Sequence, residues 1–214
     1  IVNLLNDANC NHIVFAGKIY RPALAQINPD LAAMVMLTKA GISGDDNLLR
    51  AIEAYFSENG FVLVAQDVVH ARDSLPTDYL FGQHPEPDVV ADINFGISML
   101  SRLSEFDVGQ AMIVQSGRVL AIEAAEGTDA MITRTKAFID PDAAPAIFLK
   151  MAKLNQSNSQ DLPVFGADTI AHLQKAKIHY ACLQVQLCRL AAPLFEIENA
   201  ARQAGISLMS VDYD

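Results

Sequence analysis

Residues 107–131 read DVGQAMIVQSGRVLAIEAAEGTDAM, and they hold two apolar runs, 108–114 and 119–124, on either side of Ser116-Gly117. A short turn that contains glycine between two strand-like runs is typical of a β-hairpin. Directly after the second run, Glu126-Gly127-Thr128-Asp129 opens a short helix. An antiparallel hairpin beside other strands predicts a mixed sheet in this half of the chain.

Strand-like and helix-like segments alternate on both sides of the hairpin. The strand-like segments are 12–16, 61–65, 146–151, 178–185 and 206–211. The helix-like segments are 30–39, one from a Ser43 or Asp45 cap to Asn59-Gly60, one from Asp88 to Leu103, one after Gly166, and 193–203. The alternation predicts an α/β protein, with a parallel sheet and right-handed crossovers in the first half.

Residues 72–87 differ in character from the segments around them, because they combine three prolines and a glycine with mixed polarity. Such a stretch is typical of a connector. We therefore expect a first domain over 1–71, a linker over 72–87 and a second domain over 88–214. Residues 1–9 resemble the last turns of a helix that runs into a strand, so we also expect a preceding N-terminal segment.

Composition excludes several classes of protein. The chain has 214 residues, of which 51% are hydrophobic and 19% charged, and this is not the composition of a disordered chain. Its three cysteines cannot frame a disulfide mini-protein, and we expect Cys182 and Cys188 to be core residues. A net charge of −10 without a basic stripe argues against nucleic-acid binding. With no apolar stretch of about 18 residues, we expect no transmembrane segment and a cytoplasmic protein.

The strongest local feature is a cluster of three carboxylates, Glu123, Glu126 and Asp129, at the exit of a strand and the start of a helix. Clustered carboxylates can hold Mg²⁺, and the N–H groups at a helix start can receive phosphate oxygens beside Gly127. The alternative is helix capping, with Thr128 as the cap and the acids facing the positive end of the helix dipole. On the residues alone, capping is favoured.

A second feature is the segment 150–166, KMAKLNQSNSQDLPVFG. Lys150 and Lys153 precede a polar loop, and Pro163 holds Asp161 in a defined position in that loop. Two ammonium groups near a carboxylate suit a phosphate-bearing substrate, with Asp161 binding metal or orienting water. A solvated loop with a capping Asp is the alternative.

The third feature lies in the first half, where Lys18, Arg21, Asp45 and Asp46 fall in loops after predicted parallel strands. Such loops meet at one edge of a sheet and commonly bind ligands. The lysine and arginine could contact a phosphate or a uracil ring, and the acids a ribose or base. Turn and capping chemistry is the alternative for these residues too.

Taken together, these segments resemble the UDP-2,3-diacylglucosamine pyrophosphatases of the LpxI type, from lipid A biosynthesis in Gram-negative bacteria. The residues that carry the resemblance are Gly44-Asp45-Asp46 with Leu48-Leu49-Arg50, Asp107-Val-Gly-Gln110, the run 117–131, and Asp161-Leu162-Pro163 with Gly166 and Thr169. The run Glu-Ala-Ala-Glu-Gly-Thr-Asp at 123–129 is long and unusual, and the order of the segments holds across most of the chain.

The resemblance implies a Rossmann-like N-terminal domain and a C-terminal α/β domain characteristic of the family. It implies Mg²⁺-dependent hydrolysis of UDP-2,3-diacylglucosamine to 2,3-diacylglucosamine 1-phosphate (lipid X) and UMP, with the substrate between the domains. It further implies a cytoplasmic enzyme at or near the inner membrane, with no nucleic-acid partner. A homodimer is an additional expectation. The family's Asp-Leu-Pro aspartate is important for catalysis, and it falls on Asp161.

A site hypothesis combines the three features with the resemblance. Its catalytic residues are Asp161, Lys150 and Lys153. Its metal ligands are Glu123, Glu126, Asp129 and Asp161. Its substrate-binding residues are Lys18, Arg21, Asp45, Asp46, Gln110, Gly127, Thr128, Gln156 and Thr169. Candidates for an apolar acyl-chain cleft are Phe138, Ile147, Phe148 and Phe165, although an ordinary core role is favoured for them.

The chain also departs from the family pattern. The family has a longer N-terminus with a glycine-rich first strand-to-helix turn. In the lysine loop its pattern reads Lys-x-x-Lys-Pro-x-Gln-Asp-x-Arg-x-Asp-Leu-Pro, whereas Leu154, Ser157 and Ser159 stand here at the Pro, Asp and Arg positions. Two rival functions therefore stay open: a UDP-sugar- or lipid-binding protein without hydrolysis, and a hydrolase of a water-soluble nucleotide sugar.

Overall fold

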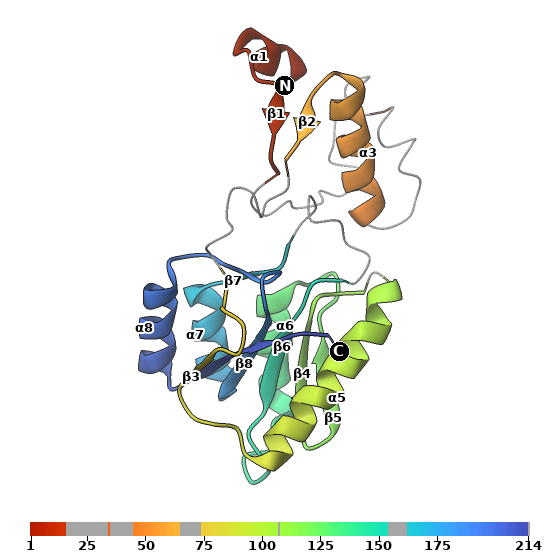
Figure 1. Cartoon of the computed structure of the whole chain (residues 1–214). Coiled ribbons are helices and arrows are strands. Elements are labelled where there is room, and N and C mark those ends of the chain that lie inside the picture. The colour runs from red at the N-terminus through yellow and green to blue at the C-terminus, as the bar shows by residue number, and fades with distance from the viewer. Residues whose placement is uncertain (16–33, 35–44, 65–73, 107, 154–161, 214) are drawn as a thin grey trace. The chain divides into compact units, whose positions relative to one another are not determined.

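The computed structural model describes residues 1–15, 34, 45–64, 74–106, 108–153 and 162–213, with the backbone alone for 45–49. The chain divides into two compact units. The N-terminal unit comprises Ile1–Val69 and Ser157–Asp161, and the C-terminal unit comprises His70–Gln156 and Leu162–Asp214. Each unit is described by itself (Figure 1).

The N-terminal unit contains a parallel pair of short strands with a helix between them in the chain. Its elements are α1 (Val2–Asp7), β1 (His12–Ile13), α3 (Asp45–Glu58) and β2 (Val62–Leu63). β1 pairs in parallel with β2, and the ring of Phe56 lies about 6 Å from the rings of Phe15 and Phe61. The strands predicted at 12–16 and 61–65 are present as the shorter β1 and β2, and the helix from Asp45 is confirmed. The predicted helix at 30–39 lies outside the described residues apart from Met34.

A six-stranded mixed sheet organises the C-terminal unit. Its strands are β3 (Leu80–Phe81), β4 (Ala111–Gln115), β5 (Arg118–Ile122), β6 (Ile147–Lys150), β8 (Tyr180–Gln184) and β10 (Ser207–Val211), in the spatial order β3-β10-β8-β6-β4-β5. β6, β8 and β10 are parallel to one another, and the other three pairings are antiparallel. A separate parallel pair joins β7 (Val164–Phe165) to β9 (Arg189–Leu190). The predicted mixed α/β class is therefore confirmed.

The predicted hairpin is formed by β4 and β5, and the side chain of Asp92, which is not part of the hairpin, holds its turn. Ser116 and Gly117 both have positive φ, 52° and 71°, as a two-residue turn of this hand requires. The buried carboxylate of Asp92 accepts the backbone N–H groups of both turn residues at 2.6 Å. These hydrogen bonds satisfy an acid that would be costly to bury alone.

Helices cover both faces of the sheet (Figure 1). α5 (Pro87–Leu103) packs on one face, where its Val89, Ile93 and Leu100 join Met112 and Leu149 in one core cluster. The other face carries α6 (Thr128–Thr135), α7 (Ala167–Ala176) and α8 (Leu194–Ala204). Two single 3₁₀ turns, η2 (Ser104–Phe106) and η3 (Lys136–Phe138), follow α5 and α6.

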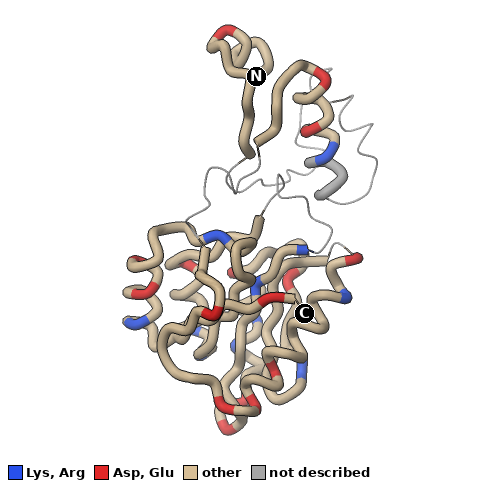
Figure 2. Tube along the Cα trace, in the orientation of Figure 1, with Lys and Arg blue, Asp and Glu red and all other residues tan. Residues whose placement is uncertain are grey.

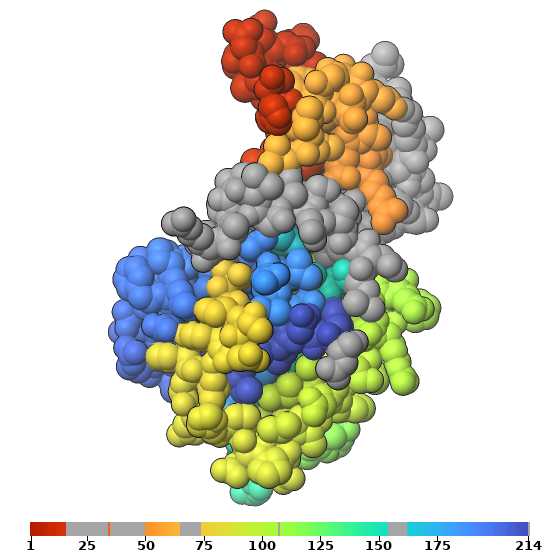
Figure 3. Space-filling model, in the orientation of Figure 1, coloured from red at the N-terminus to blue at the C-terminus, as the bar shows by residue number. Residues whose placement is uncertain are grey.

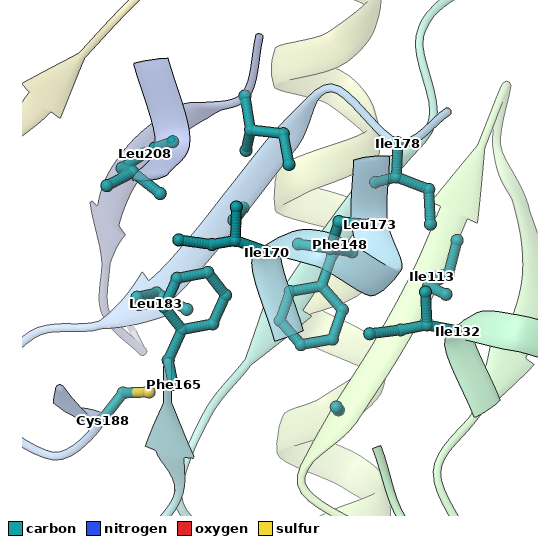
Figure 4. Close-up of a cluster of buried hydrophobic side chains, with 14 of the residues drawn as sticks. Ile113, Ile132, Phe148, Phe165, Ile170, Leu173, Ile178, Leu183, Cys188 and Leu208 are labelled. Carbon is teal, nitrogen blue, oxygen red and sulfur yellow. The ribbon is translucent and has the colours of Figure 1, made fainter. Parts of the chain in front are cut away.

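The larger core cluster lies between the sheet and α6, α7 and α8. Figure 4 shows Ile170 and Leu173 of α7 among Phe148, Phe165 and other buried side chains of this cluster. The rings of Phe148 and Phe165 lie 6.2 Å apart. Ile147, Phe148 and Phe165 are fully buried, so they are core residues and do not line a cleft for acyl chains. Cys182 and Cys188 are fully buried as predicted.

The predicted linker 72–87 is in part a structural element of the C-terminal unit. Its residues Leu80 and Phe81 form β3, which pairs with β10, and Leu75 is buried in the core. In the space-filling view the yellow stretch that includes these residues lies against the C-terminal elements drawn in blue (Figure 3). The sequence gives no sign of β3, because a two-residue strand leaves no periodic pattern.

Candidate functional site

Several of the predicted site residues gather at one edge of the six-stranded sheet. Lys150 ends β6, Glu123 follows β5, and Gln110 precedes β4. Because β4 runs antiparallel to both neighbours, its first residues lie beside the last residues of β5 and β6, with Ala111 opposite Lys150 and Met112 opposite Ile122. The sheet register therefore brings three separate parts of the sequence together at this edge.

A chain of hydrogen bonds joins Lys150 to Glu123. Lys150 Nζ donates to Thr128 Oγ1 at 2.9 Å, and Thr128 Oγ1 donates to Glu123 Oε1 at 2.7 Å. The backbone N–H of Gln110 donates to the other carboxylate oxygen of Glu123 at 3.3 Å. Lys150 is only 7% exposed, so its ammonium group is held at the sheet edge rather than extended into solvent. We call Lys150, Thr128 and Glu123 the relay.

Gly109 explains why the Asp-Val-Gly-Gln motif contains a glycine. A Cβ atom at Gly109 would lie far inside van der Waals contact with the carbonyl oxygen of Glu123. The absence of a side chain therefore lets the segment before β4 approach the segment after β5. That approach brings the N–H of Gln110 to the Glu123 carboxylate.

The start of α6 supplies one further polar group, Asp129. The helix begins after Gly127, which has a φ of 80°, and no side chain caps it. Thr128 therefore does not act as the helix cap that the alternative interpretation assumed, because its hydroxyl is used in the relay. Asp129 Oδ1 accepts a hydrogen bond from Thr169 Oγ1 of α7 at 3.4 Å.

The three clustered carboxylates are not assembled into a single metal site. Glu126 forms an ion pair with Arg134 at 2.8 Å, and the hydrogen bonds from Arg134 are the main cause that lowers the pKa of this acid. Glu123 is held in the relay and Asp129 by Thr169, so each acid has a different partner. Within the described ranges, no three His, Cys, Asp or Glu side chains gather to hold a metal ion.

Other predicted site residues are placed only in part. Lys153 follows β6 and is half-buried. Asp45 and Asp46 begin α3, and the structure gives no side-chain positions for them. Lys18, Arg21, Gln156 and Asp161 lie outside the described residues. Their roles stay predictions.

Sequence reasoning missed Arg189, a buried cation of β9. Arg189 is only 5% exposed, and its backbone N–H donates to the carbonyl oxygen of Pro163 at 2.7 Å. It therefore sits beside the end of the Asp161-Leu162-Pro163 motif. The signal was present, since Arg189 is a single charge inside the otherwise uncharged run CLQVQLCRLAA at 182–192.

Two other features lie away from the relay. Phe138 is 61% exposed, unlike the three other residues considered for an acyl cleft. A cavity of about 410 Å³ is lined by residues from the other end of β4 and β6, among them Gln115, Asp140 and Ala146, and by Lys177 after α7. None of the predicted site residues lines this cavity.

Fold and site together define a mixed α/β protein with cationic and acidic side chains where the parallel strands end, a common place for ligands in α/β sheets. Comparison with protein families agrees with this class. The model of the LpxI C-terminal domain matches residues 76–209, and that of the LpxI N-terminal domain matches residues 1–72. The chain belongs to the LpxI family.

One curated relative gives the family a chemical name. The protein is 32% identical over 184 residues to "UDP-2,3-diacylglucosamine pyrophosphatase LpxI" of Caulobacter vibrioides. The match covers 82% of this chain and 66% of the relative, so the chain spans just under two thirds of that protein's length. In the part of the chain that the structure describes, no helix has the length and apolar character needed to cross a membrane.

Proposed function

We propose that this protein hydrolyses the diphosphate of UDP-2,3-diacylglucosamine, giving 2,3-diacylglucosamine 1-phosphate and UMP. The observation that carries the proposal is the match to the Caulobacter pyrophosphatase over most of this chain. The buried ammonium group of Lys150 at the sheet edge supports it, because a diphosphate needs cationic partners in a site shielded from water.

In the proposed reaction, the oxygen of a water molecule bonds to one phosphorus of the diphosphate, and the P–O bond to the bridging oxygen breaks. Negative charge increases on the phosphoryl oxygens and on the leaving phosphate. The hydrogen bond to Thr128 holds Lys150 so that its ammonium can offset this charge. Lys153, three residues further along the chain, adds a second cation. Asp161 is proposed to orient the attacking water, whose proton passes to solvent.

Mg²⁺ is part of the proposal although the described acids form no complete metal site. Proteins usually hold Mg²⁺ through one or two carboxylates together with substrate phosphates. Asp129 and Asp161 are the acids that fit this role best, because Glu126 is paired with Arg134 and both oxygens of Glu123 already accept hydrogen bonds. The bound ion would neutralise charge on the phosphoryl oxygens.

The remaining expectations complete the proposal. Lys18, Arg21, Asp45 and Asp46 are proposed to contact the nucleotide from a Rossmann-like N-terminal unit. Gln110, Gly127, Gln156 and Thr169 are proposed to contact the substrate beside the relay. We further propose that the enzyme acts in the cytoplasm, touches the inner membrane from one side to reach its lipid substrate, and forms a homodimer.

The proposal is tested by incubating the chain with UDP-2,3-diacylglucosamine and following UMP by chromatography and the sugar lipid by mass spectrometry. We expect UMP and the monophosphorylated sugar to appear in equal amounts with Mg²⁺ and not with EDTA. An Asp161→Ala variant should lose at least about a hundredfold in turnover. Undiminished turnover of Asp161→Ala would refute the role of Asp161.

The rival without hydrolysis is favoured by Ser157 and Ser159, which stand where the family pattern has Asp and Arg. The same samples distinguish the two functions. Thermal stabilisation of the chain by UDP-2,3-diacylglucosamine with no UMP release would establish a binding protein. Release of UMP at a catalytic rate would exclude it.

A further inference from the structure

The chain leaves the six-stranded sheet directly after Lys150, and side chains then make the hydrogen bonds that a neighbouring strand would make. β6 pairs with β8 only as far as Lys150 opposite Leu183, although β8 continues to Gln184. Two residues after Lys150, the N–H and the carbonyl oxygen of the buried Ala152 are both bonded by side chains. The backbone between Lys150 and Lys153 is therefore held in place.

Gln184 and Tyr213 make these two bonds. Gln184 Oε1 accepts the N–H of Ala152 at 2.8 Å, and the hydroxyl of Tyr213 donates to the carbonyl oxygen of Ala152 at 2.9 Å. Gln184 Nε2 donates in turn to Asp212 Oδ1 at 3.1 Å, so the residues after β10 are joined to the end of β8. We call Gln184 and Tyr213 the clamp.

The two clamp residues are suited to hold a backbone segment. Gln184 is only 3% exposed, and both ends of its amide are bonded. Burial and, to a smaller extent, the charge of Asp212 raise the pKa of Tyr213 to about 12, so its hydroxyl keeps its proton for donation at neutral pH. On the β4 side of the segment, the N–H of Met151 donates to the carbonyl oxygen of Gln110 at 2.9 Å. The segment is thus bonded from both neighbouring sides of β6.

The clamp lies at the sheet edge of the candidate site. β6, β8 and β10 are parallel, so the residues that follow these strands leave the sheet at one edge. Lys153 directly follows Ala152, and the two clamp bonds therefore fix where its side chain begins. A lysine on a fixed backbone loses less conformational entropy when it contacts an anion than a lysine on a moving segment.

We propose that Tyr213 is a positioning residue of the candidate site, which holds the carbonyl of Ala152 together with Gln184 and so sets where Lys153 meets the substrate diphosphate. The inference rests on the proposed function for the identity of the diphosphate. Tyr213 does not contact the substrate, because its effect passes through Lys153. An effect of this kind disappears when Lys153 is replaced, whereas a general effect on the fold does not.

The test is a double-mutant cycle on the binding of inorganic pyrophosphate, measured by calorimetry so that it does not depend on turnover. Tyr213→Phe keeps the ring and removes the hydroxyl, and it is made both in the unmodified chain and in Lys153→Met. We expect Tyr213→Phe alone to weaken binding by at least about threefold and Lys153→Met alone by at least about tenfold. In the Lys153→Met background, Tyr213→Phe should weaken binding by less than about 1.5-fold.

Tyr180→Phe is the matched control. The hydroxyl of Tyr180 also donates to a backbone carbonyl, that of His84, at 3.3 Å. Tyr180 begins β8, however, and so lies at the opposite end of this strand from Gln184. We expect Tyr180→Phe to leave pyrophosphate binding unchanged, even if it lowers the free energy of unfolding.

Three results would overturn the inference: pyrophosphate that does not bind the unmodified chain, a Lys153→Met variant that binds it as tightly, or an equal effect of Tyr213→Phe with and without Lys153. If Tyr213→Phe does not fold, Gln184→Met replaces it in the same cycle, and additive effects there overturn the inference. If the cycle shows the coupling but UDP-2,3-diacylglucosamine is not hydrolysed, the inference stands and the proposed function fails.

Discussion

At the scale of single residues, the hydroxyl of Thr128 decides how two opposite charges share the sheet edge. It accepts a hydrogen bond from Lys150 and donates one to Glu123, so ammonium and carboxylate are linked through a neutral group. Among the described residues Thr128 is the side-chain hydrogen-bond partner of the Lys150 ammonium, which leaves two further N–H donors for a phosphate. A direct ion pair between Lys150 and Glu123 would instead have neutralised the ammonium charge within the protein and left less of it for a ligand.

Replacement of Thr128 by valine keeps the shape of the side chain and removes the hydroxyl. We expect Thr128→Val to lower kcat for UDP-2,3-diacylglucosamine by about tenfold or more, because Lys150 and Glu123 each lose a hydrogen bond in a partly buried site. Thr128→Ser retains the hydroxyl and should keep most of the activity. Equal kinetics of the Val and Ser variants would show that the hydroxyl has no role.

The cysteines provide a residue-scale test of the core. Burial raises the pKa values of Cys182 and Cys188 to about 12, whereas Cys10 is exposed. Since the thiolate is the reactive form, a thiol reagent at pH 8 should modify Cys10 alone in the folded protein and all three cysteines in urea. Mass spectrometry of the labelled peptides gives the count. Rapid labelling of Cys182 in the folded state would contradict the described core.

The same pKa values set the sign of an alkaline effect. The unfolded thiols titrate near 9.0, whereas the folded ones keep their protons to about pH 12. Above pH 9 the unfolded state therefore releases protons first, and the free energy of unfolding falls as the pH rises towards 12. Urea titrations at pH 8 and pH 10 should show that the free energy of unfolding falls less between these pH values in a Cys182→Ala, Cys188→Ala double variant than in the unmodified protein.

At the scale of elements, the hairpin of β4 and β5 depends on a residue from α5. Asp92 is 3% exposed, and its two carboxylate oxygens accept the N–H groups of Ser116 and Gly117. Helix and hairpin are thereby joined by charge-assisted hydrogen bonds as well as by apolar packing. The relay lies at the far end of the same two strands, so the position of the hairpin bears on the site.

Replacement of Asp92 by asparagine removes the negative charge and leaves one acceptor for two donors. We expect Asp92→Asn to lower the free energy of unfolding by about 1–3 kcal/mol, measured by urea titration at pH 7. Asp88→Asn is a matched control, because Asp88 is an exposed acid in the first turn of the same helix. Equal losses in the two variants would mean that the turn does not depend on Asp92.

Long elements with local signals could be predicted from the sequence, and short elements with distant partners could not. The hairpin was visible because Ser116-Gly117 separates two apolar runs, and α6 because Gly127 precedes it. β3, β7 and β9 each have two residues, too few for any periodicity, and their partners lie far away in the chain. Arg189 was missed with its strand.

At the scale of the whole molecule, the candidate site combines segments that are remote in sequence. Gln110, Glu123, Thr128 and Lys150 meet because β4 is central between β5 and β6. Sequence analysis predicted these residues as members of the site. It could not predict the hydrogen-bond partner of each acid, because that depends on side-chain geometry and not on spacing in the sequence. Glu126 illustrates this, because it forms an ion pair with Arg134 in the last turn of α6 and not with the other members of the acidic cluster. Figure 2 shows the acidic and basic residues scattered over the described part of the chain, without a continuous basic stripe.

The central claim is that the sheet edge around Lys150 performs the hydrolysis, and turnover of a Lys150→Met variant tests it most directly. Lys175→Met is the control, since Lys175 is exposed in the last turn of α7. We predict that Lys150→Met, folded by circular dichroism, releases UMP from UDP-2,3-diacylglucosamine at least about a hundredfold more slowly than the unmodified chain, while the control is unchanged. Equal rates of UMP release by all three proteins would contradict the account.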